Sequence, residues 1–541
     1  MTNLITAALC CFAAPHLVAS HRCQHESHLH RGDVVRSGQR YDAAPPLLPR
    51  GISLTASSSR RRLGAPAVTY AAESWGPMRI AVDFSNVDLA AGSPQLEYLQ
   101  NKLVPAAVEW WQRTLAVRRV QGPLKLSAWC ESEYRVDFSQ FGTDSCASYA
   151  ATTTCAGHEE VTIPSDHIAI GVENADFLLY VSNKAMDATT LGYALSCQRD
   201  QFGRPIAGMI NLTPTHVTAS TDVTSPSFIA QWEKEFMVSL HELGHALGFS
   251  SSSFAHFVDA GGNPLAADDV VRRVTERGES VQKLITPLIS ARAQDHFACH
   301  APTTVGGING VELESQGSEG TAGSHLESRI YMDELMTGAI QENTVKSTIS
   351  LSFFEDSGWY HVNYTQAEPQ PWGFHSGCAF PSKPCVDAAT TTPLARSFCV
   401  ASGATRCTAS REQTSTCRVG TWPTELPTWY QYFGSGLPKQ GGMAELNDYC
   451  PVHGNDAAAI DEVCTDDTSG TLVSGTSASA ALSAYGATHG AQSRCFDSSL
   501  NTGRSSAADP DTDRYAFVVV RAPSSRAHPQ YVSSTIPSPP P

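Results

Sequence analysis

The segment HELGHALGFS, from His241 to Ser250, carries two histidines four residues apart, with a glutamate beside the first. Residues four apart share one face of a helix, so His241 and His245 can both direct an imidazole nitrogen at one Zn²⁺ ion. Glu242 then projects toward the open position of the metal. Zinc lowers the pKa of a bound water, and a neighbouring carboxylate can take its proton as the water attacks a peptide carbonyl. This spacing favours zinc-assisted hydrolysis with Glu242 as general base, although an ordinary helix with outward polar residues has the same pattern.

A catalytic zinc ion held by two histidines needs a third protein ligand. The compact metzincin pattern has a histidine three residues after the glycine, but Ser251 stands three residues after Gly248. The downstream candidates are His256, His296, His300 and His325. We prefer His325 because Met336 follows eleven residues later, and a turn carrying a methionine supports the metal site in metzincins. The alternative for Met336 is an ordinary core residue.

The helix that carries the two histidines is predicted from about Pro226 to Leu247. Ser225-Pro226 provides a cap and a first turn. Apolar residues recur at helical spacing on one face, at Phe236, Leu240, Leu243 and Leu247. Gly248 follows where a sharp turn can end the helix and return the chain to the metal.

Other elements surround this helix in the sequence. Strands of a partly buried sheet are predicted at Met78 to Phe84, Ala175 to Ser182 and Ile206 to Leu212. Pro94 to Val117 is predicted as an amphipathic helix that is kinked or restarted at Pro105, and another helix is expected near Ser347 to Asp356. From Pro371 onward Cys, Pro, Gly and aromatic residues dominate, which predicts a loop-rich region held by disulfides.

Length and composition limit the fold and the partners. A chain of 541 residues is too long for one ordinary core, and a formal net charge of -16 argues against a broad nucleic-acid surface, which needs clustered Lys and Arg. Sixteen cysteines, crowded between Cys378 and Cys495, indicate disulfides made in an oxidising compartment. No segment after the N-terminal apolar stretch is long enough to be a transmembrane helix.

The sequence predicts five regions. Residues 1–20 are expected to be a signal peptide, because an apolar stretch ends in the small residues Val-Ala-Ser20; a frayed apolar terminus is the alternative. Residues 21–72 are expected to be a leader. Residues 73–370 would form the catalytic domain, with an N-terminal part to about 250 and a central part 251–370. Residues 371–495 would form a disulfide-rich domain, and the low-complexity tail 496–541 is expected to be disordered. Asn211 and Asn363 lie in sequons and would accept glycans if exposed.

The chain resembles the leishmanolysins, a family of zinc peptidases, in blocks that keep the family's order from Trp75 to about Cys495. These blocks are WGPMRIAV, HELGHALGFS, TAGSHLESRIYMDELMTG, PWGFHSGCAF, LPTWYQYF and NDYCPV. In that family a long insertion separates the glycine of the zinc motif from the third histidine, and here 80 residues separate His245 from His325. The departure from the compact spacing therefore agrees with the family.

The resemblance implies one zinc ion per chain bound by His241, His245 and His325, with Glu242 catalytic and Met336 in the Met-turn. It implies an α+β fold: a metzincin catalytic domain with a mixed sheet, an active-site helix and a long insertion before the third zinc ligand, followed by a Cys-rich, loop-rich C-terminal domain. It also implies that the substrate lies extended along an edge strand, which we place within Gly203 to Leu212.

The leader and the remaining cysteines gain a role from the same resemblance. The block from His21 to Glu26 resembles the family's propeptide block, so the thiolate of Cys23 would occupy the open zinc position as a latency switch; alternatively, Cys23 pairs in a disulfide or is incidental. Block matching implies the disulfides Cys155–Cys197, Cys299–Cys378, Cys385–Cys450, Cys399–Cys417 and Cys407–Cys495, and leaves Cys130–Cys146 as a local pair. Cys464 is left without a partner.

We therefore expect a secreted or cell-surface zinc metalloendopeptidase that acts on polypeptides and is made as a latent proenzyme. The alternative is a catalytically silent adhesin or binding protein that keeps the zinc scaffold, which the intact Glu242 disfavours. A zinc hydrolase for non-peptide substrates is disfavoured by the extended cleft that the resemblance implies. Surface association would need a C-terminal anchor, and no apolar tail of that kind is visible.

Overall fold

The computed structural model describes residues 68–128, 152–156, 158–186, 190–217, 226–259, 262–301, 307–317, 320–341, 343–454, 460–463, 494–497 and 515–518. The expected signal peptide, Cys23, Cys464 and the expected pair Cys130–Cys146 lie outside these ranges. Within them, no helix combines the length and the apolar character needed to span a bilayer.

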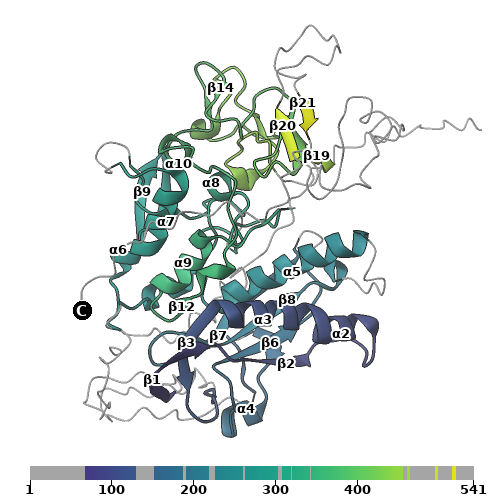
Figure 1. Cartoon of the computed structure of the whole chain (residues 1–541), viewed down its shortest axis with the longest axis vertical. Helices are drawn as coiled ribbons and strands as arrows, with labels where there is room; N and C mark the ends of the chain where they lie inside the picture. Colours follow the sequence, from purple (N-terminus) through teal and green to yellow (C-terminus); the bar gives the residue numbers. More distant parts are fainter. Residues whose placement is uncertain are drawn as a thin grey trace, which may run out of the picture.

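A four-stranded mixed sheet in the order β2-β6-β8-β7 underlies the first half of the fold (Figure 1). Its strands are β2 (Ile80–Asn86), β6 (Phe177–Ser182), β7 (Gly192–Arg199) and β8 (Pro205–Leu212). β6 is parallel to both β2 and β8, whereas β7 is antiparallel to β8. Among the described strands, β7 is therefore an edge. The expectation of an edge strand within Gly203 to Leu212 is wrong, because β8 is hydrogen-bonded on both sides and fully buried.

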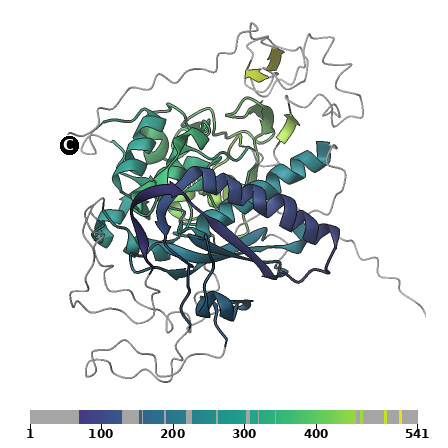
Figure 2. The same ribbon diagram turned by 60° about the horizontal axis from the view of Figure 1, so that its bottom comes forward.

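Two helices lie side by side on one face of this sheet, α3 (Val104–Thr114) and α5 (Pro226–Ala246) (Figure 1 and Figure 2). α3 follows α2 (Pro94–Tyr98) through a π-helical turn, η1 (Leu99–Leu103). The helix restarts where Pro105 removes a backbone donor, as the sequence predicts. It ends at Thr114 rather than Val117, because Leu115 already belongs to a strand. The indole of Trp111 donates to the carbonyl of Leu240 at 3.1 Å and joins the two helices.

A three-stranded sheet joins two distant parts of the chain. It contains β1 (Tyr70–Pro77), β3 (Leu115–Val120) and β12 (His361–Val362), with β3 in the middle. β1 and the buried Val68 belong to the folded body although the range 21–72 was expected to be leader, because β1 pairs with β3 from Tyr70 onward. Smaller elements nearby are β4 (Thr154–Cys155), β5 (His158–Thr162), α4 (Ser165–Ala169) and η4 (Pro214–His216).

The region between α5 and β12 is more ordered than its sequence suggests. It contains η5 (Ser251–His256), α6 (Ala267–Val270), β9 (Val271–Glu276), β10 (Glu279–Leu284), α7 (Pro287–Phe297), β11 (Val311–Glu312), α8 (Ser328–Tyr331) and α9 (Thr348–Asp356). α9 matches the predicted helix. The β9–β10 hairpin was not predicted, because five of its twelve strand residues are charged and its turn uses Arg277 and Gly278, both at positive φ.

The C-terminal region consists of short strands and turns. Its elements are η7 (Tyr364–Gln366), α10 (Ala379–Ser382), β13 (Val386–Asp387), β14 (Thr392–Pro393), β15 (Thr405–Cys407), β16 (Gln413–Thr416), β17 (Val419–Thr421), η8 (Thr428–Tyr430), β18 (Gln440–Gly442), η9 (Glu445–Asn447) and β19 (Ile460–Val463). The structure contains five of the six expected disulfides, Cys155–Cys197, Cys299–Cys378, Cys385–Cys450, Cys399–Cys417 and Cys407–Cys495.

The tail 496–541 is not wholly without structure. β20 (Arg494–Asp497) pairs antiparallel with β21 (Tyr515–Val518), which lies inside that tail. The expectation of disorder is wrong at this strand, because its apolar, β-favouring residues find a partner strand that the Cys407–Cys495 disulfide attaches to the body.

One continuous core runs from Met78 in the first sheet to Cys450 in the C-terminal region. A buried arginine connects the same regions. Arg329, which is fully buried, donates through Nε to Asp448 at 3.2 Å and through its terminal nitrogens to the carbonyls of Phe380 at 3.2 Å and Pro381 at 2.9 Å. The ranges 73–370 and 371–495 therefore share one interior.

The two sequons have opposite environments. The side chain of Asn211 is buried in β8 and bonded to Ser182 and to the backbone of Lys184, so this residue is not a glycosylation site. Asn363 is exposed, and its carboxamide oxygen accepts from the hydroxyl of Thr365 at 2.7 Å.

Candidate metal centre

Three histidines converge on one point. The Nε2 atoms of His241 and His245 are 3.0 Å apart, those of His245 and His325 3.0 Å, and those of His325 and His241 3.2 Å. All three side chains are buried. Nitrogens that each lie about 2 Å from one tetrahedral ion are separated by roughly 3.3 Å. The donor set and its spacing fit a zinc ion.

Backbone carbonyls orient the three imidazole rings. Nδ1 of His241 donates to the carbonyl of Leu335 at 2.6 Å. Nδ1 of His245 donates to the carbonyl of Phe249 at 2.5 Å, and Nδ1 of His325 donates to the carbonyl of Thr321 at 2.9 Å. A carbonyl only accepts hydrogen bonds, so each Nδ1 carries the proton and each Nε2 keeps its lone pair toward the shared point. The site is thus prepared for a cation by groups outside the ligands.

The end of α5 places its two histidines. Leu240, Leu243 and Leu247 are fully buried and fix the rotation of the helix against the core. Phe249 N–H then bonds to the carbonyl of Gly244, and Gly248 adopts a φ of +121°, a conformation that L side chains rarely reach. This turn brings the Phe249 carbonyl within hydrogen-bond distance of Nδ1 of His245.

Met336 lies directly against α5, the helix that carries His241 and His245. A Cβ at Gly244 would stand 2.8 Å from the Met336 sulfur, so only glycine leaves room for this contact between the two histidines of the helix. The next residue back, Leu335, accepts the bond from His241, and Met336 itself accepts from the backbone of Leu326 at 2.8 Å. The turn at Met336 therefore supports both the helix and the segment that carries His325.

Glu242 is buried and faces the edge strand of the sheet. A Cβ at Gly192, the first residue of β7, would stand 3.0 Å from Oε1 of Glu242 and 2.8 Å from the carbonyl of Asn211. The carboxylate thus lies between the histidines on α5 and the start of β7. A chain bound along β7 would have its peptide groups beside this carboxylate.

The family model described as Leishmanolysin matches residues 81–535. This chain belongs to the leishmanolysin family. It is 30% identical over 504 residues to a leishmanolysin-like peptidase of Drosophila melanogaster, an alignment that covers 80% of this chain and 69% of the relative. It is 28% identical over 464 residues to the leishmanolysin of Leishmania chagasi, covering 80% and 68%, and 29% identical over 468 residues to a leishmanolysin-like peptidase of Caenorhabditis elegans, covering 72% and 68%. Membership of this peptidase family implies metallopeptidase activity.

The other candidate histidines of this chain lie away from the triad. His256 ends η5 and packs against Gly203. Nε2 of His296 donates to the carbonyl of Trp372 at 2.8 Å, and burial lowers the pKa of His296 to about 4. His300 is exposed and lies 3.8 Å from Asp295. Of the four candidates, only His325 joins His241 and His245.

Several residues of the site were not predicted. Gly192 and Gly244 provide room for Glu242 and Met336, and the carbonyls of Leu335 and Thr321 orient two ligands. The glycine inside HELGH was a usable signal, since glycine destabilises a helix interior and calls for a packing reason. The carbonyls have no signal in sequence, because every residue has one.

Proposed function

We propose that this chain is a zinc metalloendopeptidase of the metzincin type that hydrolyses peptide bonds within proteins. The observation that carries the proposal is the convergence of three Nε2 atoms within 3.2 Å of one another. Two of them belong to α5, where the buried carboxylate of Glu242 directly follows His241. Zinc bound there would lower the pKa of water and polarise the scissile carbonyl. His241, His245 and His325 would hold it.

Glu242 acts as general base in this proposal. Its carboxylate takes the proton of the attacking water and passes it to the leaving amine, a role that typically contributes about 10²- to 10⁴-fold in rate. The carboxylate of Glu242 is buried between the histidines and β7, which keeps bulk water from competing for that proton. Gly192 gives the carboxylate space on the side where the substrate would enter.

The substrate would bind as an added strand on β7. No described strand occupies the second edge of β7, and an extended peptide can pair with such an edge through main-chain hydrogen bonds. This placement replaces Gly203 to Leu212 as the expected binding strand. Main-chain pairing also favours polypeptides over other hydrolysable compounds.

The test is casein cleavage by the purified full chain, before and after limited proteolysis, with and without a zinc chelator. Glu242→Gln should lose activity by roughly 10³-fold or more while it retains zinc. Glu233→Gln, an exposed residue of the same helix, is the matched control and should cleave normally. Undiminished cleavage by the Glu242 variant would remove it from this role. Absence of cleavage by the zinc-loaded chain would favour the silent adhesin.

The leader would keep the enzyme latent. We infer, from the resemblance of the block around Cys23, that its thiolate excludes the catalytic water until the leader is removed. Cys23→Ser should then raise the basal activity of the full chain, whereas unchanged latency would count against the switch.

The same proposal places the protein in the secretory pathway, secreted or held at the cell surface. Five disulfides in the structure support folding in an oxidising compartment. Recovery of the expressed protein from the culture medium, with residues 1–20 removed, would test the export signal.

A further inference from the structure

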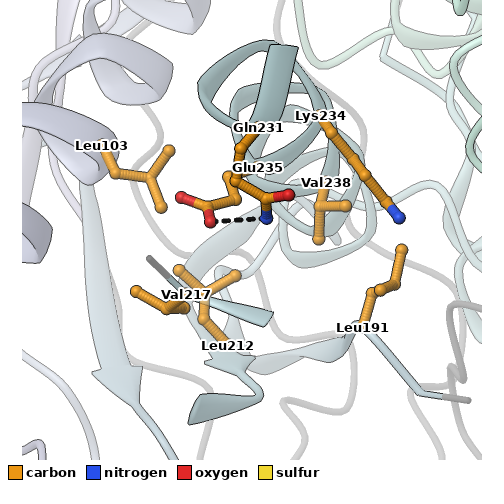
Figure 3. A pocket seen from close by; sticks show the side chains of 8 residues that line it. All are labelled: Leu103, Leu191, Leu212, Val217, Gln231, Lys234, Glu235 and Val238. Carbon is orange, nitrogen blue, oxygen red and sulfur yellow. Dashed lines mark hydrogen bonds between the residues drawn. The ribbon is translucent and has the colours of Figure 1, made fainter. Parts of the chain in front are cut away.

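The end of α5, which carries His241 and His245, is held by groups that lie outside the helix. Beside the middle of α5 the packing is incomplete, and Figure 3 shows a pocket there that is partly open to solvent. Its lining comes from four residues of α5 and four aliphatic side chains of other segments: Gln231, Lys234, Glu235, Val238, Leu103, Leu191, Leu212 and Val217. The carbonyls that orient the two histidine rings belong to Leu335 and Phe249. These supports, rather than the helix alone, decide where the imidazole nitrogens point.

A buried carboxylate directly precedes Leu335. Glu334 is fully buried, and each of its two oxygens accepts a hydrogen bond from a serine hydroxyl, Oε1 from Ser347 and Oε2 from Ser350 at 2.6 Å. Both serines lie at the start of α9, where Ser347 is the N-cap and its hydroxyl accepts from the backbone of Ile349 at 2.9 Å. A negative charge is favourable at the N-terminus of a helix. The carboxylate therefore binds the segment of Leu335 to the first turn of α9.

Backbone pairing holds the same two segments in register. The N–H of Leu335 donates to the carbonyl of Val345 at 2.9 Å, and the N–H of Val345 donates to the carbonyl of Asp333 at 2.7 Å. Glu334 lies opposite Val345 in this short parallel bridge. The side chain of Glu334 thus extends a link that the backbone begins, and a movement of α9 would move Leu335 with it.

α9 also reaches the support of the second histidine. The rings of Phe353 and Phe249 have their centroids 4.2 Å apart, and the carbonyl of Phe249 accepts from His245. Phe354, the next residue of α9, packs edge-on against Trp111 with 4.9 Å between the ring centroids. Trp111 belongs to α3, which lies beside α5. α9 is therefore packed against both the turn that ends α5 and the helix next to it.

We propose that Glu334 is a positioning residue of the proposed zinc site: by joining the segment of Leu335 to α9, its carboxylate sets the two histidine rings of α5 relative to each other. The proposal rests on the proposed function, which assigns both rings to zinc. One end of the link carries Leu335, the acceptor for His241. The other end is α9, which packs on Phe249, the acceptor for His245. A shift of either carbonyl would turn one ring and move its Nε2 away from the position that the ion requires.

The first measurement is metal binding by the full chain, which needs no substrate. Glu334→Ala removes both hydrogen bonds and should weaken zinc binding, measured in competition with a chelator, by about ten-fold or more. It should also change the visible absorption spectrum of the Co²⁺-loaded chain, because that spectrum depends on how the ligands are arranged around the ion. Glu334→Gln should stay close to the unmodified chain in both measurements, since its carboxamide can accept from one serine hydroxyl and donate to the other. Equal losses in the Ala and Gln variants would overturn the proposal, because the hydrogen-bonded link would then not position the rings.

Two serines of α9 give a matched pair of milder variants. Ser350→Ala removes one of the two bonds to Glu334, whereas Ser352→Ala removes a buried hydroxyl that donates to the carbonyl of Ile349 within the same helix. Ser350→Ala should weaken zinc binding and alter the Co²⁺ spectrum, and Ser352→Ala should do neither. If Glu334→Ala does not fold, this pair decides the question. Unchanged metal binding in Ser350→Ala, or an equal loss in Ser352→Ala, would overturn the positioning role.

Casein cleavage separates this proposal from the proposed function. In zinc-saturated chains activated by limited proteolysis, Ser350→Ala should lower kcat and leave KM unchanged, because a misplaced ion affects the chemical step and not the pairing of the substrate with β7. A rise in KM with unchanged kcat would contradict the positioning role. Absence of cleavage by the unmodified, zinc-loaded chain would instead contradict the proposed function, and the metal measurements would still decide the role of Glu334.

Discussion

The sulfur of Met336 occupies the space that a side chain at Gly244 would need, with only 2.8 Å between that sulfur and a Cβ built at the glycine. Gly244 lies between the two histidines of α5, and the residue before Met336 accepts the hydrogen bond that orients His241. The packing of this pair therefore sets the distance between the helix and the turn beneath the three histidines.

Gly244→Ala should destabilise the protein by about 1–3 kcal/mol, because the added methyl group must displace Met336 inside a packed core. The same substitution should lower the affinity for zinc. Chemical unfolding and zinc content measure both effects. Gly436→Ala is the control, since nothing lies within 4 Å of a Cβ there. In the double variant Gly244→Ala, Met336→Ala the two costs should not add; additive costs would mean that the contact does not exist.

His325→Ala should reduce zinc from about one ion per chain to a small fraction, because two histidines alone hold zinc weakly. His300→Ala, which changes an exposed histidine outside the triad, should keep full occupancy. Metal analysis of the purified proteins gives the answer. Full occupancy in the His325 variant would show that another residue is the third ligand.

Gly192→Ala should slow catalysis without loss of zinc. Its methyl group would press on the Asn211 carbonyl and on the carboxylate of Glu242, and a displacement of about 1 Å in a catalytic group can cost roughly 10²-fold in rate. The measurements are kcat, KM and zinc content. Normal kcat would indicate that Glu242 does not lie against β7 during the reaction.

His296 should make stability depend on pH below neutrality. Its pKa, about 4 in the folded protein against 6.5 for an ordinary histidine, is lowered mainly by burial. Between these values the unfolded chain binds a proton that the folded chain does not, so the contribution of His296 to stability is constant above pH 6.5 and falls as the pH drops from 6.5 to 4. His296→Gln, whose amide can still donate to Trp372, should flatten that fall in melting temperature. The exposed His300→Gln should not, and an equal slope in all three proteins would contradict the assignment.

The parts of the fold and the site that could be predicted from the sequence are those marked by residue spacing within one segment or by the resemblance to the family. The spacing of apolar residues predicts α5 to within a residue of its end, and the turn at Gly248 follows from the only residue type that adopts its φ easily. His325 lies 80 residues from His245, and no periodicity connects the two. Its place in the triad was expected from the methionine that follows it eleven residues later, Met336, and from the resemblance to a family with that insertion.

The parts that could not be predicted depend on long-range pairing. An edge strand was expected within Gly203 to Leu212, yet the mostly apolar sequence of β8 is typical of a strand covered on both sides. Asn211 was a plausible sequon until the fold placed it inside that strand. The edge position of β7 follows from sheet order, which depends on contacts between residues distant in the chain.

Arg329 stands four residues after His325, and its buried guanidinium depends on acceptors from the C-terminal region, Asp448 and the carbonyl of Pro381. A disulfide joins Cys385, four residues after Pro381, to Cys450, two residues after Asp448. Reducing that bond would loosen both acceptor segments and leave a buried charge unpaired, which costs several kcal/mol. The C-terminal region therefore stabilises the segment that carries His325, so loss of this buried disulfide would weaken the proposed zinc site from a distance.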